Sequence, residues 1–454
     1  MSEPTITLRA ECLCRTHSFT TAIPLSELPL QGSACHCTSC RHVTGALRSS
    51  DAVWPGPASD IAKALAAIKN NNNSPEGDGS GTLKRYRHSA RVNVVFCGIC
   101  GSGMFFEEFE EAGKDEDESV RGVAGMGEGW AARQDRREGK NYLVFTGTLK
   151  VEGDVRGRQV VRCEDHIFVG DTVDGGSVNW LRGLNQDGKG EGEQVAVWLG
   201  NRNKSEEVKE GEYWPAVKEL QKGYEANLKA AEGGKGNVPI RCHCGGVDLV
   251  LRAGEAQREF EEMQRKGEQL PWFVDPATHK LLGSLDCCDS CRIWAGSEVY
   301  NWTFSLLKHI SFAGADRTGF PGNTSELRAA VEGKHGKPRD ARLGTLAIYA
   351  SSSDVQRYHC GRCSASVFYA VDERPDMVDI AVGLLYAADG ARAESVLSWA
   401  FGGPFSWKQD MAGTWREGFL KAVERDSEKW RIERGYPKNW RRVTSEQAEQ
   451  AAQK

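Results

Sequence analysis

The sequence lacks the features that mark membrane-embedded or exported proteins. None of its hydrophobic stretches approaches the ~18 uninterrupted apolar residues that a membrane helix requires. Residues 1–5 combine neither a basic segment nor an apolar run, so we expect no secretory signal. These absences predict a protein without a membrane partner and with a cytoplasmic location, and they leave a nuclear location open.

An excess of charge of one sign is also missing. The 454 residues include 58 Lys and Arg and 63 Asp and Glu, which gives a formal net charge of −5. Because nucleic-acid-binding surfaces carry an excess of basic residues, this balance argues against a nucleic-acid partner. Only 39% of the residues are hydrophobic, whereas glycine occurs 51 times. The length predicts two or three domains, and the composition predicts cores connected by polar, glycine-rich loops.

Cysteine, by contrast, is abundant and unevenly distributed. In a reducing compartment, 15 cysteines indicate metal binding rather than disulfides. All but one of them fall into groups, which are Cys12 and Cys14; Cys35, Cys37 and Cys40; Cys97 and Cys100; Cys242 and Cys244; Cys287, Cys288 and Cys291; and Cys360 and Cys363. Only Cys163 stands alone. His166 follows it at C-x-x-H spacing, but we expect no metal there because no second pair accompanies it.

The order of these groups shows that the chain repeats itself. A C-x-C pair, a group of three cysteines and a C-x-x-C pair occur in residues 12–100 and again in residues 242–363. Around the last pair, Tyr and Ser positions recur at a constant offset of 263 residues. Residues 144–149 resemble residues 380–385 at an offset of 236, which indicates an insertion in the first copy. The period is far longer than the ~20–50 residues of a solenoid repeat, so we interpret the pattern as a duplicated domain.

The duplication sets the expected domain organisation. We predict a first domain at 1–184 with loop insertions near 60–82 and 107–140, a polar linker at 185–237 with a short helix near 214–231, a second domain at 238–410 and a helical tail at 411–454. Alternating apolar and polar residues beside the cysteines predict mainly β domains. Apolar residues at helical spacing predict a helix over 414–434, which we expect to dock on its own domain rather than bind a partner.

The cysteine count limits the metal sites. Zinc in proteins prefers four ligands in tetrahedral arrangement, with sulfur at ~2.3 Å. Seven cysteines per copy cannot complete two four-sulfur sites, so the count predicts one closed, structural site and one three-sulfur site with a vacant position. Spacing alone does not say which groups join. The spacing is also compatible with a purely structural role, in which every metal ion only stabilises a small sheet.

The motifs resemble those of a known family. The pattern C-x-C, C-x-C-x-x-C-R-x-x-T-G and F-C-x-x-C-G is similar to that of the glutathione-dependent formaldehyde-activating family, also called GFA or CENP-V/GFA. The first half carries it as Cys12-Leu13-Cys14, Cys35-His36-Cys37-Thr38-Ser39-Cys40-Arg41-His42-Val43-Thr44-Gly45 and Phe96-Cys97-Gly98-Ile99-Cys100-Gly101. The family usually has glycine after the first pair, where this chain has Arg15. The resemblance covers most of both halves, as two tandem copies.

The resemblance implies a zinc-bound β-tent fold for each half and separate roles for the cysteine groups. The closed structural site would be formed by Cys12, Cys14, Cys97 and Cys100. The open site, where the thiol of a glutathione-like substrate binds, would be formed by Cys35, Cys37 and Cys40. Arg41 would bind a substrate carboxylate, and we expect His36 to be a loop residue near the metal rather than an acid–base group. The implied activity is that of a carbon–sulfur lyase, which joins a thiol to formaldehyde reversibly.

The second half departs from the family pattern in its middle group. Its closed site would be formed by Cys242, Cys244, Cys360 and Cys363. Cys288 and Cys291 align with the last two cysteines of the open site, but Asp286 replaces the first. Cys287 is displaced by one residue, which on a strand turns it to the opposite face. Asp286 could bind zinc through oxygen, but we favour a degenerate copy, and therefore expect about three zinc ions per chain, with a fourth only if Asp286 binds.

The main hypothesis is a zinc-dependent carbon–sulfur lyase-type enzyme with its open site in the first domain. Its partner would be a small-molecule thiol or thiol adduct, with glutathione as the family's example. The alternative is a non-catalytic, zinc-stabilised binding module for a protein or chromatin partner. A redox switch is disfavoured because zinc would hold the thiolates. The sequence defines neither the electrophile nor the oligomeric state.

Overall fold

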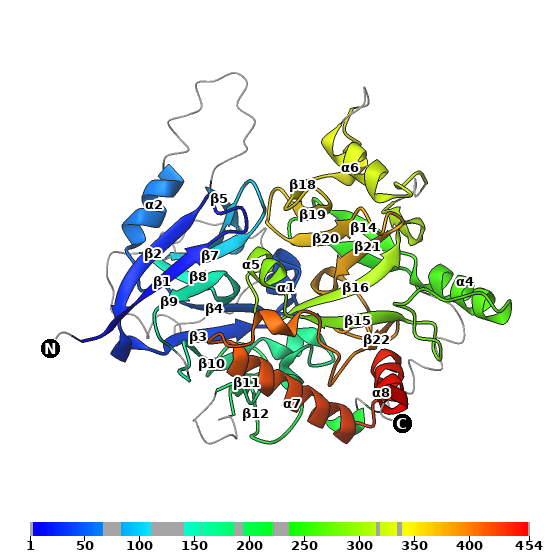
Figure 1. The fold of residues 1–454 in the computed structure, drawn as a ribbon. Coiled ribbons are helices and arrows are strands. Elements are labelled where there is room, and N and C mark those ends of the chain that lie inside the picture. The colour runs from blue at the N-terminus through cyan, green and yellow to red at the C-terminus, as the bar shows by residue number, and fades with distance from the viewer. Residues whose placement is uncertain are drawn as a thin grey trace.

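The computed structural model describes residues 3–66, 83–109, 140–155, 157–185, 194–219, 221, 236–314, 318–333 and 338–452. Strands predominate in both halves (Figure 1), which agrees with the prediction of a mainly β protein. The predicted insertions near 60–82 and 107–140 and the linker helix near 214–231 lie largely outside the described residues. Within the described ranges, no helix is long and apolar enough to cross a membrane.

The first half forms two sheets. The smaller has the strand order β2-β1-β9, and the larger has the order β12-β11-β10-β3-β4-β8-β7-β6-β5. Their bounds are β1 (Thr5–Glu11), β2 (Ser18–Pro24), β3 (Leu30–Cys35), β4 (Ser49–Val53), β5 (Leu83–Arg87), β6 (Val92–Cys97), β7 (Gly103–Phe109), β8 (Lys140–Phe145), β9 (Leu149–Glu152), β10 (Val161–Ile167), β11 (Ala196–Trp198) and β12 (Glu207–Val208). Helix α1 (Thr38–Thr44) connects β3 to β4, and α2 (Ala58–Ala66) follows β4.

The second half also forms a small and a large sheet. Their strand orders are β13-β14-β17 and β18-β19-β20-β21-β16-β15-β22. The bounds are β13 (Val238–Arg241), β14 (Asp248–Leu251), β15 (Leu281–Asp286), β16 (Tyr300–Leu306), β17 (Ile310–Phe312), β18 (Leu346–Ala350), β19 (Val355–Cys360), β20 (Ser366–Val371), β21 (Met377–Ala381) and β22 (Leu397–Trp399). Helices α4 (Ala253–Arg265), α5 (Asp289–Ala295) and α6 (Thr324–Glu332) lie between the strands in sequence.

The two large sheets share one strand order. From one edge, seven strands follow as β5-β6-β7-β8-β4-β3-β10 in the first half and as β18-β19-β20-β21-β16-β15-β22 in the second. In both, the last pair is parallel. Both also contain a register shift in equivalent strands, at Val95/Phe96 and at Tyr358/His359. These shifts are 263 residues apart, the same offset that relates the cysteine groups.

The halves pack through reciprocal contacts of α1 and α5, each of which lies against a tight turn of the other half. The Gly383 N–H donates a hydrogen bond to the Gly45 carbonyl at 2.9 Å, and the Gly147 N–H donates to the Gly296 carbonyl at 3.1 Å. A Cβ atom on Gly383 would lie only 2.1 Å from the carbonyl oxygen of Ala46. This close approach explains why the turn requires glycine.

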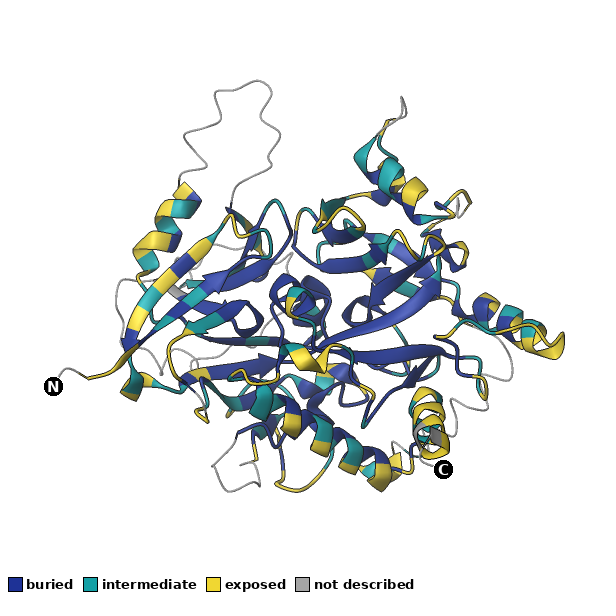
Figure 2. Ribbon diagram, in the orientation of Figure 1, coloured by how far each residue is buried: buried dark blue, intermediate teal, exposed yellow. Residues whose placement is uncertain are grey.

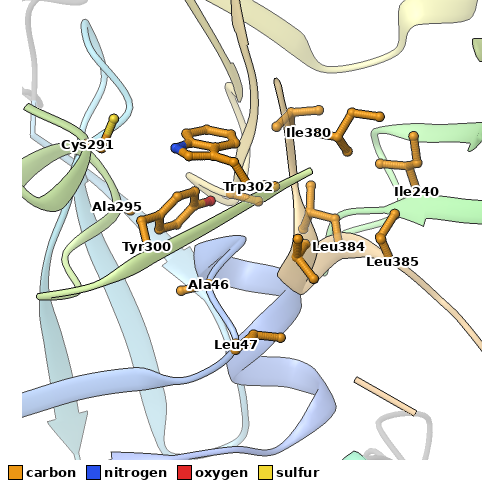
Figure 3. Close-up of a cluster of buried hydrophobic side chains, with 14 of the residues drawn as sticks. Ala46, Leu47, Ile240, Cys291, Ala295, Tyr300, Trp302, Ile380, Leu384 and Leu385 are labelled. Atoms are coloured by element: carbon orange, nitrogen blue, oxygen red, sulfur yellow. The ribbon is translucent and has the colours of Figure 1, made fainter. Parts of the chain in front are cut away.

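One hydrophobic core runs through both halves. Ala46 and Leu47 of the first half lie near Ile240, Leu384 and Leu385 of the second (Figure 3), and all five belong to the same buried cluster. Buried residues concentrate in the sheets and at this junction, whereas the helices at the periphery expose their outer faces (Figure 2). Because the core is continuous, we expect the two halves to stabilise each other.

Two helices end the chain, α7 (Glu417–Glu433) and α8 (Trp440–Ala452). Trp430 of α7 is fully buried. Its ring packs against Trp180 of the first half and Phe401 of the second, with ring centroids 5.4 Å and 4.8 Å away. Helix α7 therefore docks on its own chain and contacts both halves.

The junction of the halves can be tested by filling the space beside one turn glycine. Replacing Gly383 with alanine should lower the free energy of unfolding by about 2–3 kcal/mol, because the new Cβ would overlap backbone atoms of the other half. Urea denaturation of the zinc-loaded protein measures this change. Gly236→Ala is the control, since a Cβ there meets no atom within 4 Å. Equal midpoints for the two variants would show that the junction tolerates displacement.

Candidate functional site

Four cysteines at the ends of β1 and β6 form a closed cluster. The Sγ atoms of Cys12, Cys14, Cys97 and Cys100 all lie within 4.8 Å of one another. Two of these distances, from Cys14 to Cys12 and to Cys97, are 3.5 Å. Thiolates around a tetrahedral zinc ion lie about 3.8 Å apart, so the donor set and the spacing fit zinc.

The second half contains an equivalent closed cluster after β13 and β19. The Sγ atoms of Cys242, Cys244, Cys360 and Cys363 also lie within 4.8 Å of one another. Cys244 is 3.5 Å from both Cys242 and Cys360. The same argument therefore applies, and each half has a four-sulfur group suited to a structural zinc ion.

A three-sulfur cluster lies between β3 and α1. The Sγ atoms of Cys35, Cys37 and Cys40 lie within 4.8 Å of one another, and these side chains are at most 7% exposed. Cys37 caps α1 by accepting a hydrogen bond from the Cys40 N–H at 3.2 Å. Hydrogen bonds from the Cys35 and Cys40 thiols and from this N–H hold the pKa of Cys37 well below its usual range.

Two histidines that sequence reasoning did not single out lie beside this cluster. The Nε2 atom of His88 is 3.8 Å from the Cys40 Sγ. His243 of the second half packs against His88 with ring centroids 4.7 Å apart, and it hydrogen-bonds the Tyr86 hydroxyl at 2.7 Å. Burial lowers the pKa of His88 to about 4, so its ring is neutral at pH 7. Among the described residues, no fourth ligand atom lies within 4.8 Å of all three sulfurs.

His36 makes a buried hydrogen bond that supports the fold. Its Nε2 atom is 3.0 Å from Nδ1 of His166, and Nε2 of His166 is 2.9 Å from the Leu181 carbonyl oxygen. Because that carbonyl can only accept, His166 donates to it and its Nδ1 accepts the proton of His36. Burial lowers the pKa of His166 to about 3, so both rings stay neutral. His166 forms no metal cluster with Cys163 among the described residues.

Arg41, which is predicted to bind a substrate carboxylate, has hydrogen-bond donors without a partner among the described residues. It is 5% exposed, and one guanidinium nitrogen donates to the Thr38 hydroxyl at 3.2 Å. Its Nε and Nη1 atoms are buried and have no hydrogen-bond partner among the described residues. The equivalent Arg292 instead donates to the Gly147 carbonyl at 2.5 Å and to the Asp289 carboxylate at 2.6 Å. Arg41 therefore has two donor nitrogens without a partner among the described residues, whereas Arg292 has only its Nε.

The middle group of the second half also brings three possible ligand atoms together. Ligand atoms of Asp286, Cys288 and Cys291 lie within 4.8 Å of one another. Cys287, the displaced cysteine, is fully buried and is not part of the group. The Asp286 carboxylate accepts the Cys288 N–H at 2.8 Å, and Arg357 donates to the Cys291 Sγ at 3.7 Å. The aspartate thus takes the place that a cysteine has in the first half.

Comparison with known protein families identifies the first half. Residues 7–126 match the family model described as "GFA: Glutathione-dependent formaldehyde-activating enzyme". The matched range is about a quarter of the chain and contains all seven clustered cysteines of the first half. Over residues 7–126 the chain is therefore similar to this family, as the motifs of the first half predict. No curated protein and no solved structure matches the chain.

The backbone beside the first closed cluster offers a stability test. Arg15 adopts a φ of 63°, in the left-handed region that favours glycine, and its equivalent in the second half is Gly245 with a φ of 67°. Arg15→Gly should raise the free energy of unfolding by about 0.5–1 kcal/mol, because the left-handed strain outweighs the added flexibility of the unfolded chain. Gly245→Ala should lower it by a similar amount. Guanidinium denaturation measures both, and a destabilised Arg15→Gly variant would contradict the strain argument.

Proposed function

We propose that the chain is a zinc-dependent carbon–sulfur lyase-type enzyme that acts on a thiol adduct at Cys35, Cys37 and Cys40. The observation that carries this proposal is the number of converging ligands. The closed clusters have four sulfurs, whereas this group has three and, among the described residues, no fourth ligand atom close to all of them. Zinc with three protein ligands keeps a position for substrate, where it acts as a Lewis acid toward a thiol or a carbonyl.

The surrounding side chains suit a thiol that carries a carboxylate. Arg41 has two buried donor nitrogens without partners among the described residues, and a carboxylate can accept a charge-assisted hydrogen bond from one of them. His88 is neutral and lies 3.8 Å from Cys40, where its ring can hydrogen-bond an incoming thiol. When the adduct forms, the substrate sulfur bonds to the carbonyl carbon, and the thiol proton is transferred to the carbonyl oxygen. Cleavage reverses both changes.

We also propose that the second half is a second, diverged copy of the GFA domain. The shared order of seven strands, the register shifts at equal offset and the equivalent closed clusters support a duplication. The reciprocal packing of α1 and α5 fits two related units facing each other. This arrangement also brings His243 of one unit beside the open cluster of the other.

One observation favours the alternative, a zinc-stabilised binding module without catalysis. The three sulfurs of the open group are at most 7% exposed, as expected of a site that only stabilises the fold. The unpartnered donors of Arg41 favour the enzyme, because a purely structural site has no need of them. Activity measurements on single-residue variants distinguish the two.

The role of the open cluster is tested by Cys37→Ala. With glutathione and formaldehyde as substrates, the rate of adduct formation should fall on the order of 100-fold, because the group loses one of its three sulfur ligands. Circular dichroism checks that the fold is retained. Cys163→Ala is the matched control, since that cysteine belongs to none of the clusters. Full activity in a folded Cys37→Ala protein would refute catalysis at this site.

The role of Arg41 is tested by Arg41→Met. The KM for a thiol with a carboxylate should rise about tenfold or more, because the substrate loses a charge-assisted hydrogen bond. The KM for 2-mercaptoethanol, which has no carboxylate, should change little, and Arg41→Lys should restore part of the loss. Equal increases in KM for both thiols would mean that Arg41 supports the fold rather than the substrate.

A further inference from the structure

The Asp286 group of the second half opens into a large cavity. The cavity has a volume of about 780 Å³, and Asp286, Cys288 and Cys291 form part of its wall. Its lining includes side chains of β15 and β16 and, from the start of α8, Arg441. Cys288 is half-buried, in contrast to the buried cysteines of the first-half group. A volume of this size accommodates a whole small-molecule ligand.

Six aromatic side chains line this cavity. They are Trp272, Trp302, Phe304, Tyr369, Phe405 and Trp407. Trp272 packs edge-on against Phe304 at 4.7 Å, and Trp407 is 58% exposed although it lines the cavity. Trp407 also adopts a φ of 56°, a strained backbone conformation for a tryptophan. Large apolar surfaces held open to solvent favour a ligand that is itself apolar or aromatic.

The charged groups of the wall restrict the ligand further. Arg374 already pairs with Asp379 at 3.0 Å, and Asp410 accepts the Asp289 N–H at 3.0 Å. Arg441 of α8 has its guanidinium 4.8 Å from the centre of the Trp272 ring. Among the described residues, no carboxylate lies within ion-pair distance of Arg441. A small anionic group on an aromatic ligand would therefore find one unpaired cation in this cavity.

The Asp286 group fits a zinc ion with one position left for substrate. Two sulfurs and one carboxylate oxygen are accepted zinc ligands, and they converge within 4.8 Å. Arg357, which is 2% exposed, donates to both the Cys291 Sγ and the Ser290 hydroxyl and so stabilises a thiolate there. Zinc at this point would face the cavity.

We propose that the second half contains a second ligand site, which binds a bulky aromatic thiol with its sulfur at the Asp286–Cys288–Cys291 cluster and its ring between the tryptophans. This site differs from the one proposed in the first half by its aspartate ligand and its aromatic cavity. The inference requires metal binding in the second half. It does not require catalysis at Cys35, Cys37 and Cys40.

Isothermal titration calorimetry of the zinc-loaded full chain with benzyl mercaptan tests the proposal. Benzyl mercaptan should bind at least tenfold more tightly than benzyl alcohol, which has the same ring without the sulfur, and more tightly than glutathione. In the Cys37→Ser background, which disables the thiol site proposed in the first half, binding should be lost in Cys288→Ala and weakened about tenfold in Trp407→Ala, because each removes one of the two contacts. Tyr386→Ala is the control, since Tyr386 is also exposed but does not line the cavity.

The Cys37→Ser variant separates this proposal from the proposed function. Binding of benzyl mercaptan should persist in Cys37→Ser, whatever happens to adduct formation in that variant. Loss of binding in Cys37→Ser, or unchanged binding in both Cys288→Ala and Trp407→Ala, would overturn the proposal. Since Trp407 is largely exposed, its replacement tests the site even if Cys288→Ala does not fold.

Discussion

Thiol groups from distant parts of the chain approach one another to within 4.8 Å, and this convergence is the constraint on which the rest of the structure depends. One four-cysteine cluster brings Cys12 and Cys97 together, and the other brings Cys242 and Cys360 together. Several thiolates at this distance repel one another unless a cation neutralises them, and zinc supplies that charge with suitable geometry. Binding free energies of structural zinc are on the order of 10–16 kcal/mol, which is enough to determine whether the strands around each cluster fold.

The packing of the two halves against each other creates a shared core and places side chains of the second half beside the open cluster of the first. The turns at Gly147 and Gly383 allow α1 and α5 to approach the opposite half, and one core forms around them. The same junction places His243 against His88 near the open group. A single half would lack this histidine pair. The environment of the first-half site is therefore a property of the complete chain.

Much of this arrangement could be predicted from local sequence. The spacing of Cys12 and Cys14 and the CRxxTG motif that begins at Cys40 indicate the family, because ligands this close in sequence can converge on one ion. The contacts of His88 and the cavity beside Asp286 could not be predicted in this way, since they depend on strands and helices far apart in the chain. The sequence does indicate Asp286 as a candidate ligand, but its alignment with the first cysteine gives no sign of the aromatic side chains that line the cavity around it.

The most direct test of this account is the zinc content of the intact chain by native mass spectrometry, compared with that of Cys37→Ser. Two clusters have four sulfurs and two have three ligands, so the account predicts more zinc than the closed sites alone can hold. It further predicts that Cys37→Ser loses one ion while the others stay bound. A chain that holds zinc only in its two closed clusters, with a content unchanged by Cys37→Ser, would contradict the account.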